Sequence, residues 1–146
     1  MARMFDNIKW FVTPKKFKLT LIVRELIFLN YLIEKHIDYD DIKVREELYL
    51  ASYLGALSQG PELKYLIKMN FFYRMTFSGL INSLLRGLKL MDIEMLKNSH
   101  QLIEAVIQGI RKDYREATNE DILENEIVKD YVESSKGRLK ELDLYN

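Results

Sequence analysis

The chain has 146 residues, its 22 Lys and Arg balance its 22 Asp and Glu, and 48% of it is apolar. A chain of this size buries enough surface to form a core without metals or disulfides, and this apolar fraction argues against disorder. The absence of cysteine excludes disulfides, cysteine-ligated zinc, iron–sulfur clusters and thiol catalysis. We expect one helical domain over residues 1–146, and the zero net charge gives no general argument for nucleic-acid binding.

The first predicted elements are a short basic amphipathic segment over residues 1–12 and a long helix that begins after Thr13 and Pro14. Threonine caps helices, and proline suits their first turn. The long helix extends to about His36 and is apolar around most of its circumference. Such a helix lies at the centre of a bundle or is covered by a second subunit, so a homodimer is expected.

The middle of the chain holds further segments with one apolar side. Residues 41–58 predict a helix that ends before Gly60 and Pro61. After this break, apolar side chains recur every three or four residues. The spacing over 61–91 fits either one long helix or two helices joined near Gly79.

Two more helices complete the predicted order. Asp92 is placed to cap the first, and His100 lies on its apolar side, where a histidine hydrogen-bonded to a backbone carbonyl is expected. The last helix, over about 119–143, is the most charged and has a thin apolar seam. The spacing from Thr118 to Asp121 predicts a capping box at its start.

These elements predict an all-α fold, a compact bundle of five to six helices that dimerisation would complete. The most apolar stretch, Leu19 to Ile33, contains Arg24 and Glu25 and is too short for a membrane span. No secretory pattern is visible, so the expected compartment is the cytoplasm. No cofactor or small-molecule substrate is predicted, because the sequence has no phosphate-binding loop, nucleophile elbow or dinucleotide fingerprint.

Basic residues mark the start of the long helix, where acidic residues are usually favoured. Lys15, Lys16 and Lys18 occupy its first turn, and Lys9 and Trp10 precede it. Backbone N–H groups at a helix start bind anions, and aromatic rings stack on bases. These five residues are the candidates for binding a phosphate, a nucleic-acid backbone or an anionic membrane.

The charge distribution offers a structural alternative for the same lysines. Residues 1–24 have a net charge of +5, whereas residues 111–146 have a net charge of −3. Opposite charges at the two ends favour pairing of the basic start with the acidic C-terminal helix, within one chain or between two. Solvation of the lysines is the other simple interpretation.

Small residues follow one another at four-residue spacing at Gly79, Ser83 and Gly87. Residues without bulk let neighbouring helix backbones approach closely. We expect a tight helix crossing there, and the functional alternative is a groove for a partner helix or a ligand.

Carboxylates are dense near the start of the last predicted helix, at Glu120, Asp121, Glu124, Glu126 and Asp130. Carboxylates one helical turn apart hold magnesium in some helical hydrolases. No equally clear second pair occurs elsewhere, so we expect a solvated face and predict no metal site.

The sequence therefore predicts a small non-enzymatic protein that acts as an interaction or assembly module. One alternative is a nucleic-acid-binding accessory protein that uses the basic helix start. A second is a metal-dependent enzyme that uses the acidic residues.

Overall fold

The computed structural model describes residues 13–38, 44–77 and 79–144, and every regular element in these ranges is a helix. In chain order these are α2 (Lys15–Asp38), α3 (Val44–Gln59), α4 (Pro61–Met69), α5 (Phe71–Phe77), α6 (Leu80–Leu90), α7 (Ile93–Thr118), the 3-10 helix η1 (Ile122–Glu124) and α8 (Glu126–Glu141). The all-α prediction is confirmed. The predicted basic segment 1–12, with Lys9 and Trp10, lies outside the described residues.

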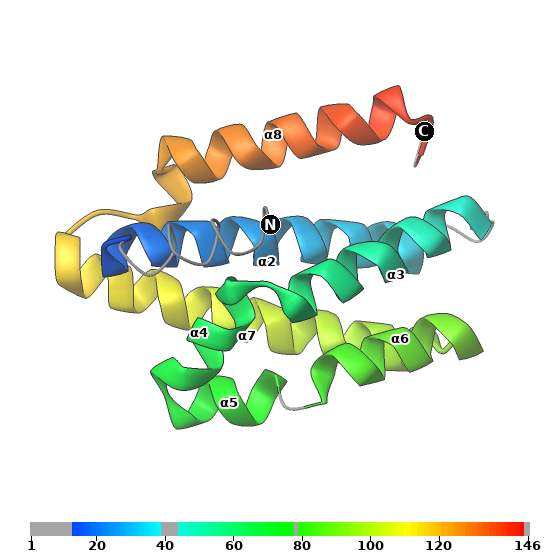
Figure 1. Cartoon of the computed structure of the whole chain (residues 1–146), viewed down its shortest axis with the longest axis horizontal. Coiled ribbons are helices and arrows are strands. Elements are labelled where there is room, and N and C mark those ends of the chain that lie inside the picture. Colours follow the sequence, from blue (N-terminus) through cyan, green and yellow to red (C-terminus); the bar gives the residue numbers. More distant parts are fainter. Residues whose placement is uncertain (1–12, 39–43, 78, 145–146) are drawn as a thin grey trace.

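Helix α2 passes through the centre of the bundle, with α8 on one side and α7 on the other (Figure 1). It packs most extensively against these two helices and also contacts α3 and α4. Its fully buried residues include Val23, Leu29, Leu32 and Ile33. One chain thus covers the apolar circumference that suggested a second subunit, and homodimerisation stays a prediction. Neither α2 nor any other described helix has the length and apolarity needed to cross a bilayer.

The segment 61–91 forms three helices instead of the one or two that its spacing predicts. At Asn70 the backbone is extended, and the Asn70 Oδ1 atom accepts a 2.9 Å hydrogen bond from the backbone N–H of Tyr73. Gly79 has a φ of 102°, a left-handed conformation that glycine adopts without steric strain. An asparagine that caps the next helix and a left-handed glycine therefore interrupt a continuous apolar pattern.

Helix α7 begins as the sequence predicts. The Asp92 side chain accepts a 3.2 Å hydrogen bond from the backbone N–H of Met95, which satisfies one of the free donors at the helix start. The apolar side of this helix is buried at Leu96, Ile103 and Ile110. The cap prediction is confirmed.

The last helix begins later than expected. Thr118 is the final residue of α7, and its hydroxyl donates a 2.8 Å hydrogen bond to the Tyr114 carbonyl. Helix α8 starts at Glu126, where the Asn125 side chain accepts a 2.9 Å hydrogen bond from the backbone N–H of Ile127. The correct cap is thus Asn125, because the chain turns through η1 before it returns along α2.

Candidate functional site

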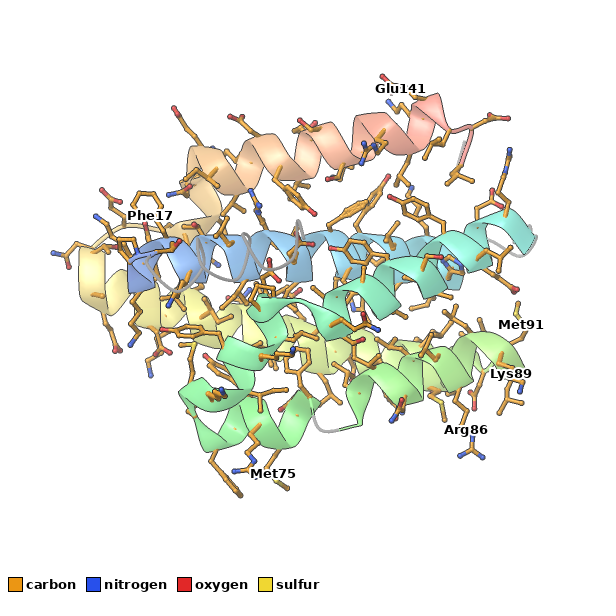
Figure 2. The ribbon with its side chains drawn as sticks, viewed as in Figure 1. Phe17, Met75, Arg86, Lys89, Met91 and Glu141 are labelled. Atoms are coloured by element: carbon orange, nitrogen blue, oxygen red, sulfur yellow. The ribbon has the colours of Figure 1, made fainter. Side chains whose placement is uncertain are left out.

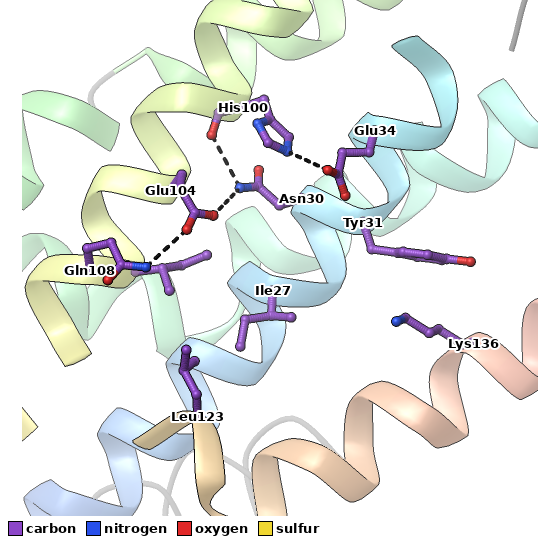
Figure 3. Close-up of a pocket in the computed structure, with 10 residues that line it drawn as sticks. Ile27, Asn30, Tyr31, Glu34, His100, Glu104, Gln108, Leu123 and Lys136 are labelled. Atoms are coloured by element: carbon purple, nitrogen blue, oxygen red, sulfur yellow. Dashed lines mark hydrogen bonds and ion pairs between the residues drawn. The ribbon is translucent and has the colours of Figure 1, made fainter. Parts of the chain in front are cut away.

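A groove of about 320 Å³ lies beside α2 and takes its lining from α2, α7, η1 and α8 (Figure 3). Ile27 and Leu123 lie at the end opposite Glu34 and His100. The groove thus has an apolar end and a polar end. Its full lining is Ile27, Asn30, Tyr31, Glu34, His100, Glu104, Ile107, Gln108, Leu123 and Lys136.

Asn30 is the most buried polar residue of the groove, with 5% of its surface exposed. Its Nδ2 atom donates to the His100 carbonyl at 3.2 Å and to Glu104 Oε2 at 3.4 Å. A carbonyl and a carboxylate only accept hydrogen bonds, so they fix the orientation of the amide. The Asn30 Oδ1 atom has no hydrogen-bond donor among the described residues. A buried acceptor without a donor is uncommon in folded proteins and marks a place where a further donor would be stabilised.

Two carboxylates flank this amide. Glu34 Oε1 lies 3.6 Å from His100 Nε2, and Glu104 accepts the bond from Asn30. The single lysine of the lining, Lys136, lies over a ring, with its Nζ atom 4.6 Å from the centroid of Tyr31. The polar end of the groove therefore offers more acceptors than donors.

The structure changes the interpretation of His100. The sequence predicts a ring that bonds to a backbone carbonyl, but the ring is half-buried and its nitrogen faces the carboxylate of Glu34. The backbone carbonyl of His100 accepts a hydrogen bond from the Asn30 side chain.

A second surface feature is the outward side of α5. Phe71, Phe72 and Met75 are 73%, 53% and 61% exposed. Positions i, i+1 and i+4 of a helix lie within one arc of its circumference, so these three side chains form one patch. We call this group the α5 patch. Exposed large apolar side chains that cluster in this way are typical of interaction sites.

The buried side of α5 explains why the patch points outward. Tyr73 and Phe77, one turn apart, are both buried and fix the helix against the bundle. The Tyr73 hydroxyl lies 3.4 Å from Asp113 Oδ2, and it would be 3.0 Å from a Cβ atom added at Gly109. The pKa of Tyr73 is raised to about 12 by burial and by the Asp113 carboxylate. Glycine on α7 thus makes room for the tyrosine that anchors α5.

Basic side chains lie beside the α5 patch and along the same edge of the molecule. Residues 61–91 contain five Lys or Arg and one Glu, a net charge of +4. Lys68 and Arg74, with Ile67 and Phe71, line a concave region of about 590 Å³ at the corner between α4 and α5. Figure 2 shows Arg86 projecting from the same edge of the molecule as Met75. This edge is therefore both apolar and basic.

The lysines predicted to bind anions lie at the start of α2 in the described part of the chain. Lys15 and Lys16 are exposed, and the Nζ atom of Lys16 lies 5.9 Å from the ring centroid of Phe17. The Nζ atom of Lys18 lies 4.8 Å from the ring centroid of Tyr65 on α4. The first turns of α5 and α6 also carry no acidic residue, so this property does not distinguish α2.

The predicted row of small residues does not lie on one helix: Gly79 precedes α6, and Ser83 and Gly87 lie within it. A Cβ atom added at Gly87 would lie 3.3 Å from Leu96 Cδ2, so α6 and α7 approach closely there. Gly79 and Ser83 are exposed. Only Gly87 therefore contributes to a tight crossing, because Gly79 precedes α6 instead of belonging to it.

Two of the acidic residues near the start of α8, Asp121 and Glu124, form ion pairs. Asp121 accepts two hydrogen bonds from the Arg111 guanidinium, at 2.6 and 2.9 Å, and a third from Arg115 at 3.2 Å. The bonds from Arg111 lower the pKa of the Asp121 carboxyl to about 2. Glu124 pairs with Lys129 at 2.6 Å. Within the described residues, no three His, Asp or Glu side chains converge as metal ligands.

His36 is buried near the end of α2, where its Nδ1 atom lies 3.0 Å from the Leu32 carbonyl oxygen. Burial disfavours the charged ring and lowers the pKa of His36 below 6.5, although the hydrogen bond to the Leu32 carbonyl and the charges of Glu47 and Glu46 act in the opposite direction. The unfolded chain then binds this proton more readily than the folded chain does. The contribution of His36 to the free energy of unfolding is therefore fully present above pH 6.5 and declines as the pH falls below this value.

We expect His36→Gln to flatten this part of the pH profile, because the glutamine side chain does not titrate. The measurement is the free energy of unfolding in urea between pH 7.5 and pH 5, compared with the parent chain. Leu48→Ala, which changes an exposed side chain that does not titrate, is the control and should keep the parental slope. Equal slopes in His36→Gln and the parent would contradict the assignment.

Comparisons with known proteins gave no match: no family model fits the chain, and no curated protein or solved structure is similar to it.

The groove and the α5 patch both went undetected in the sequence, although each left a signal. Asn30 is a polar residue inside a strongly apolar helix, and His100, Glu104 and Gln108 recur at intervals of four. Phe71 and Phe72 lie off the apolar stripe that continues through Tyr73 and Phe77, and this was the signal that both rings are exposed.

Proposed function

We propose that this protein is a non-enzymatic interaction module whose docking surface is the α5 patch together with the basic corner between α4 and α5. The observation that supports this function is the exposure of Phe71, Phe72 and Met75 beside Lys68 and Arg74. Apolar contacts at the centre and charges at the rim are the usual composition of a protein interface.

The partner that fits this surface is an acidic helical segment with one apolar side. Acidic residues complement the net charge of +4 over residues 61–91. The corner lined by Ile67, Phe71 and Arg74 is concave, so it accommodates protruding side chains better than a flat bilayer surface. A second copy docked patch to patch would bring Lys68 and Arg74 close to their own equivalents, which is unfavourable. The predicted homodimer would therefore use another surface.

The test uses a fluorescent helical peptide with leucine at positions i, i+3, i+4 and i+7 and glutamate elsewhere. We expect the peptide to bind, as measured by anisotropy, and its affinity to fall as salt is raised. Phe71→Ser and Met75→Ser should each weaken binding roughly tenfold, since apolar anchors dominate interface energies. Arg74→Glu should weaken it through charge repulsion. Leu102→Ser, at an exposed leucine on α7, is the control and should bind as the parent does.

Three further probes decide between this proposal and its competitors. A peptide with lysine in place of glutamate should not bind. Binding of phosphatidylserine vesicles instead of the acidic peptide would identify the patch as a membrane contact. Binding of a single-stranded oligonucleotide that is lost in Lys15→Glu, Lys16→Glu and Lys18→Glu would support the nucleic-acid alternative. Equal binding by the parent and by Phe71→Ser would overturn the docking surface.

A further inference from the structure

We propose that the groove lined by α2, α7, η1 and α8 binds a primary alkylammonium, a small protonated amine with a short apolar chain. This site is separate from the α5 patch and does not depend on the docking proposal. Hydrogen-bond acceptors lie at one end of the groove and apolar residues lie at the other, and the distance between the two ends fits a short alkyl chain.

The polar end supplies what an ammonium group requires. A primary ammonium has three N–H donors and no acceptor. Asn30 Oδ1 is a buried acceptor without a donor among the described residues, and Glu34 and Glu104 contribute one negative charge on each side of the Asn30 side chain. In Figure 3 the Asn30 amide oxygen points toward His100 and away from Glu104. The Glu34 side chain is 57% exposed, so an incoming ammonium can take the place of His100 as its partner.

Lys136, the single lysine of the lining, does not neutralise these carboxylates directly. Its Nζ atom lies over the Tyr31 ring at 4.6 Å from the centroid, and Figure 3 shows it on the α8 side of the groove. Glu104 is held by Asn30 and by Gln108, whose Nε2 atom donates to Glu104 Oε1 at 3.1 Å. These bonds position the carboxylate and leave its charge in place. An anionic ligand would be repelled at this end.

The remaining length of the groove fits an alkyl chain. Ile27 and Leu123 lie at the far end, and Ile107 also contributes to the lining. Seven residues separate Ile27 from Glu34 on α2, a rise of about 10 Å along the helix. A chain of about six carbons spans this distance with its charged head at Glu34. The volume of about 320 Å³ is that of a small-molecule site.

The experiment compares hexylammonium chloride, 1-hexanol and sodium hexanoate, which share one chain and differ in the charge of the head group. Titration of the ¹⁵N-labelled full chain should show saturable shifts for hexylammonium, confined to amides near the groove lining, in residues 27–34 and 100–108 and near Leu123 and Lys136. Hexanol and hexanoate should bind at least about tenfold more weakly, since the charged hydrogen bonds are lost. Glu104→Gln and Glu34→Gln should each weaken hexylammonium binding roughly tenfold.

Glu116→Gln, which removes one exposed charge elsewhere on α7, is the matched control and should leave hexylammonium affinity unchanged. Thermal unfolding of each variant verifies the fold. If Glu104→Gln proves unstable, Glu34→Gln still tests the proposal, because it changes an exposed side chain. Equal affinity for hexylammonium and hexanol would overturn the proposal. So would shifts outside the groove, no saturable binding, or full affinity in Glu34→Gln.

Discussion

Leu29→Ala is expected to lower the free energy of unfolding by about 2–5 kcal/mol, because it removes a fully buried side chain and leaves a cavity. Leu29 lies in the middle of α2, the helix that contacts α3, α4, α7 and α8. Neighbours on several sides restrict the collapse that would otherwise reduce the cost. The measurement is urea denaturation followed by circular dichroism at neutral pH.

The control for this prediction is Leu48→Ala on α3. Leu48 is 62% exposed, so its truncation should change the free energy of unfolding by less than about 0.5 kcal/mol. The two variants remove the same atoms from a helix and differ in burial. A cost below 1 kcal/mol for Leu29→Ala would show that α2 is not the centre of the bundle.

Tyr53→Phe is expected to destabilise the protein by about 1–3 kcal/mol, since it leaves a carboxylate without one of its hydrogen-bond donors. The Tyr53 hydroxyl on α3 donates to the Glu25 carboxylate on α2. The Tyr53 ring stacks on Phe28 with centroids 5.4 Å apart, and Tyr131 from α8 meets the edge of Phe28. Burial and Glu25 together raise the pKa of Tyr53. This cluster therefore links three helices through polar contacts at Glu25 and the aromatic rings around them.

Tyr31→Phe is the matched control for the hydroxyl. Tyr31 contacts two lysines through its ring: the Nζ atoms of Lys35 and Lys136 lie 5.2 Å and 4.6 Å from the ring centroid. Phenylalanine preserves that ring. We expect a change of less than about 0.5 kcal/mol. Urea denaturation of both variants decides the point: an equal cost for the two substitutions would contradict a specific role for the bond between Tyr53 and Glu25.

Local sequence signals predicted the helices well where a single residue decides the outcome. Pro14 precedes α2, Asp92 caps α7, and Pro61 begins α4. In each case the physical cause lies within four residues, since caps and first turns depend on adjacent backbone groups. The apolar side predicted for α7 likewise lies in the core, at Leu96, Ile103 and Ile110.

The helix boundaries were predicted less completely over residues 61–91, where the apolar spacing favours a continuous helix and Asn70 and Gly79 favour breaks. The three-four spacing continues through Asn70 and Gly79, and the chain breaks at both: the break at Gly79 was one of the two predicted alternatives, and the break at Asn70 was not predicted. Spacing reports which residues share a side, and it does not report whether the backbone between them stays helical. The backbone at these two residues decided that question, because the Asn70 side chain caps α5 and Gly79 takes a left-handed conformation.

By itself, the sequence determined that the chain is all-α, that α2 is apolar on several sides and that α7 has one apolar side. These properties depend on spacing and on caps, which are local. Only the tertiary structure decided that one chain covers α2, that Asn30 meets Glu104 across 74 positions, and that Phe71, Phe72 and Met75 remain outside. Contacts between distant segments depend on how helices pack, and a periodic pattern leaves that arrangement open.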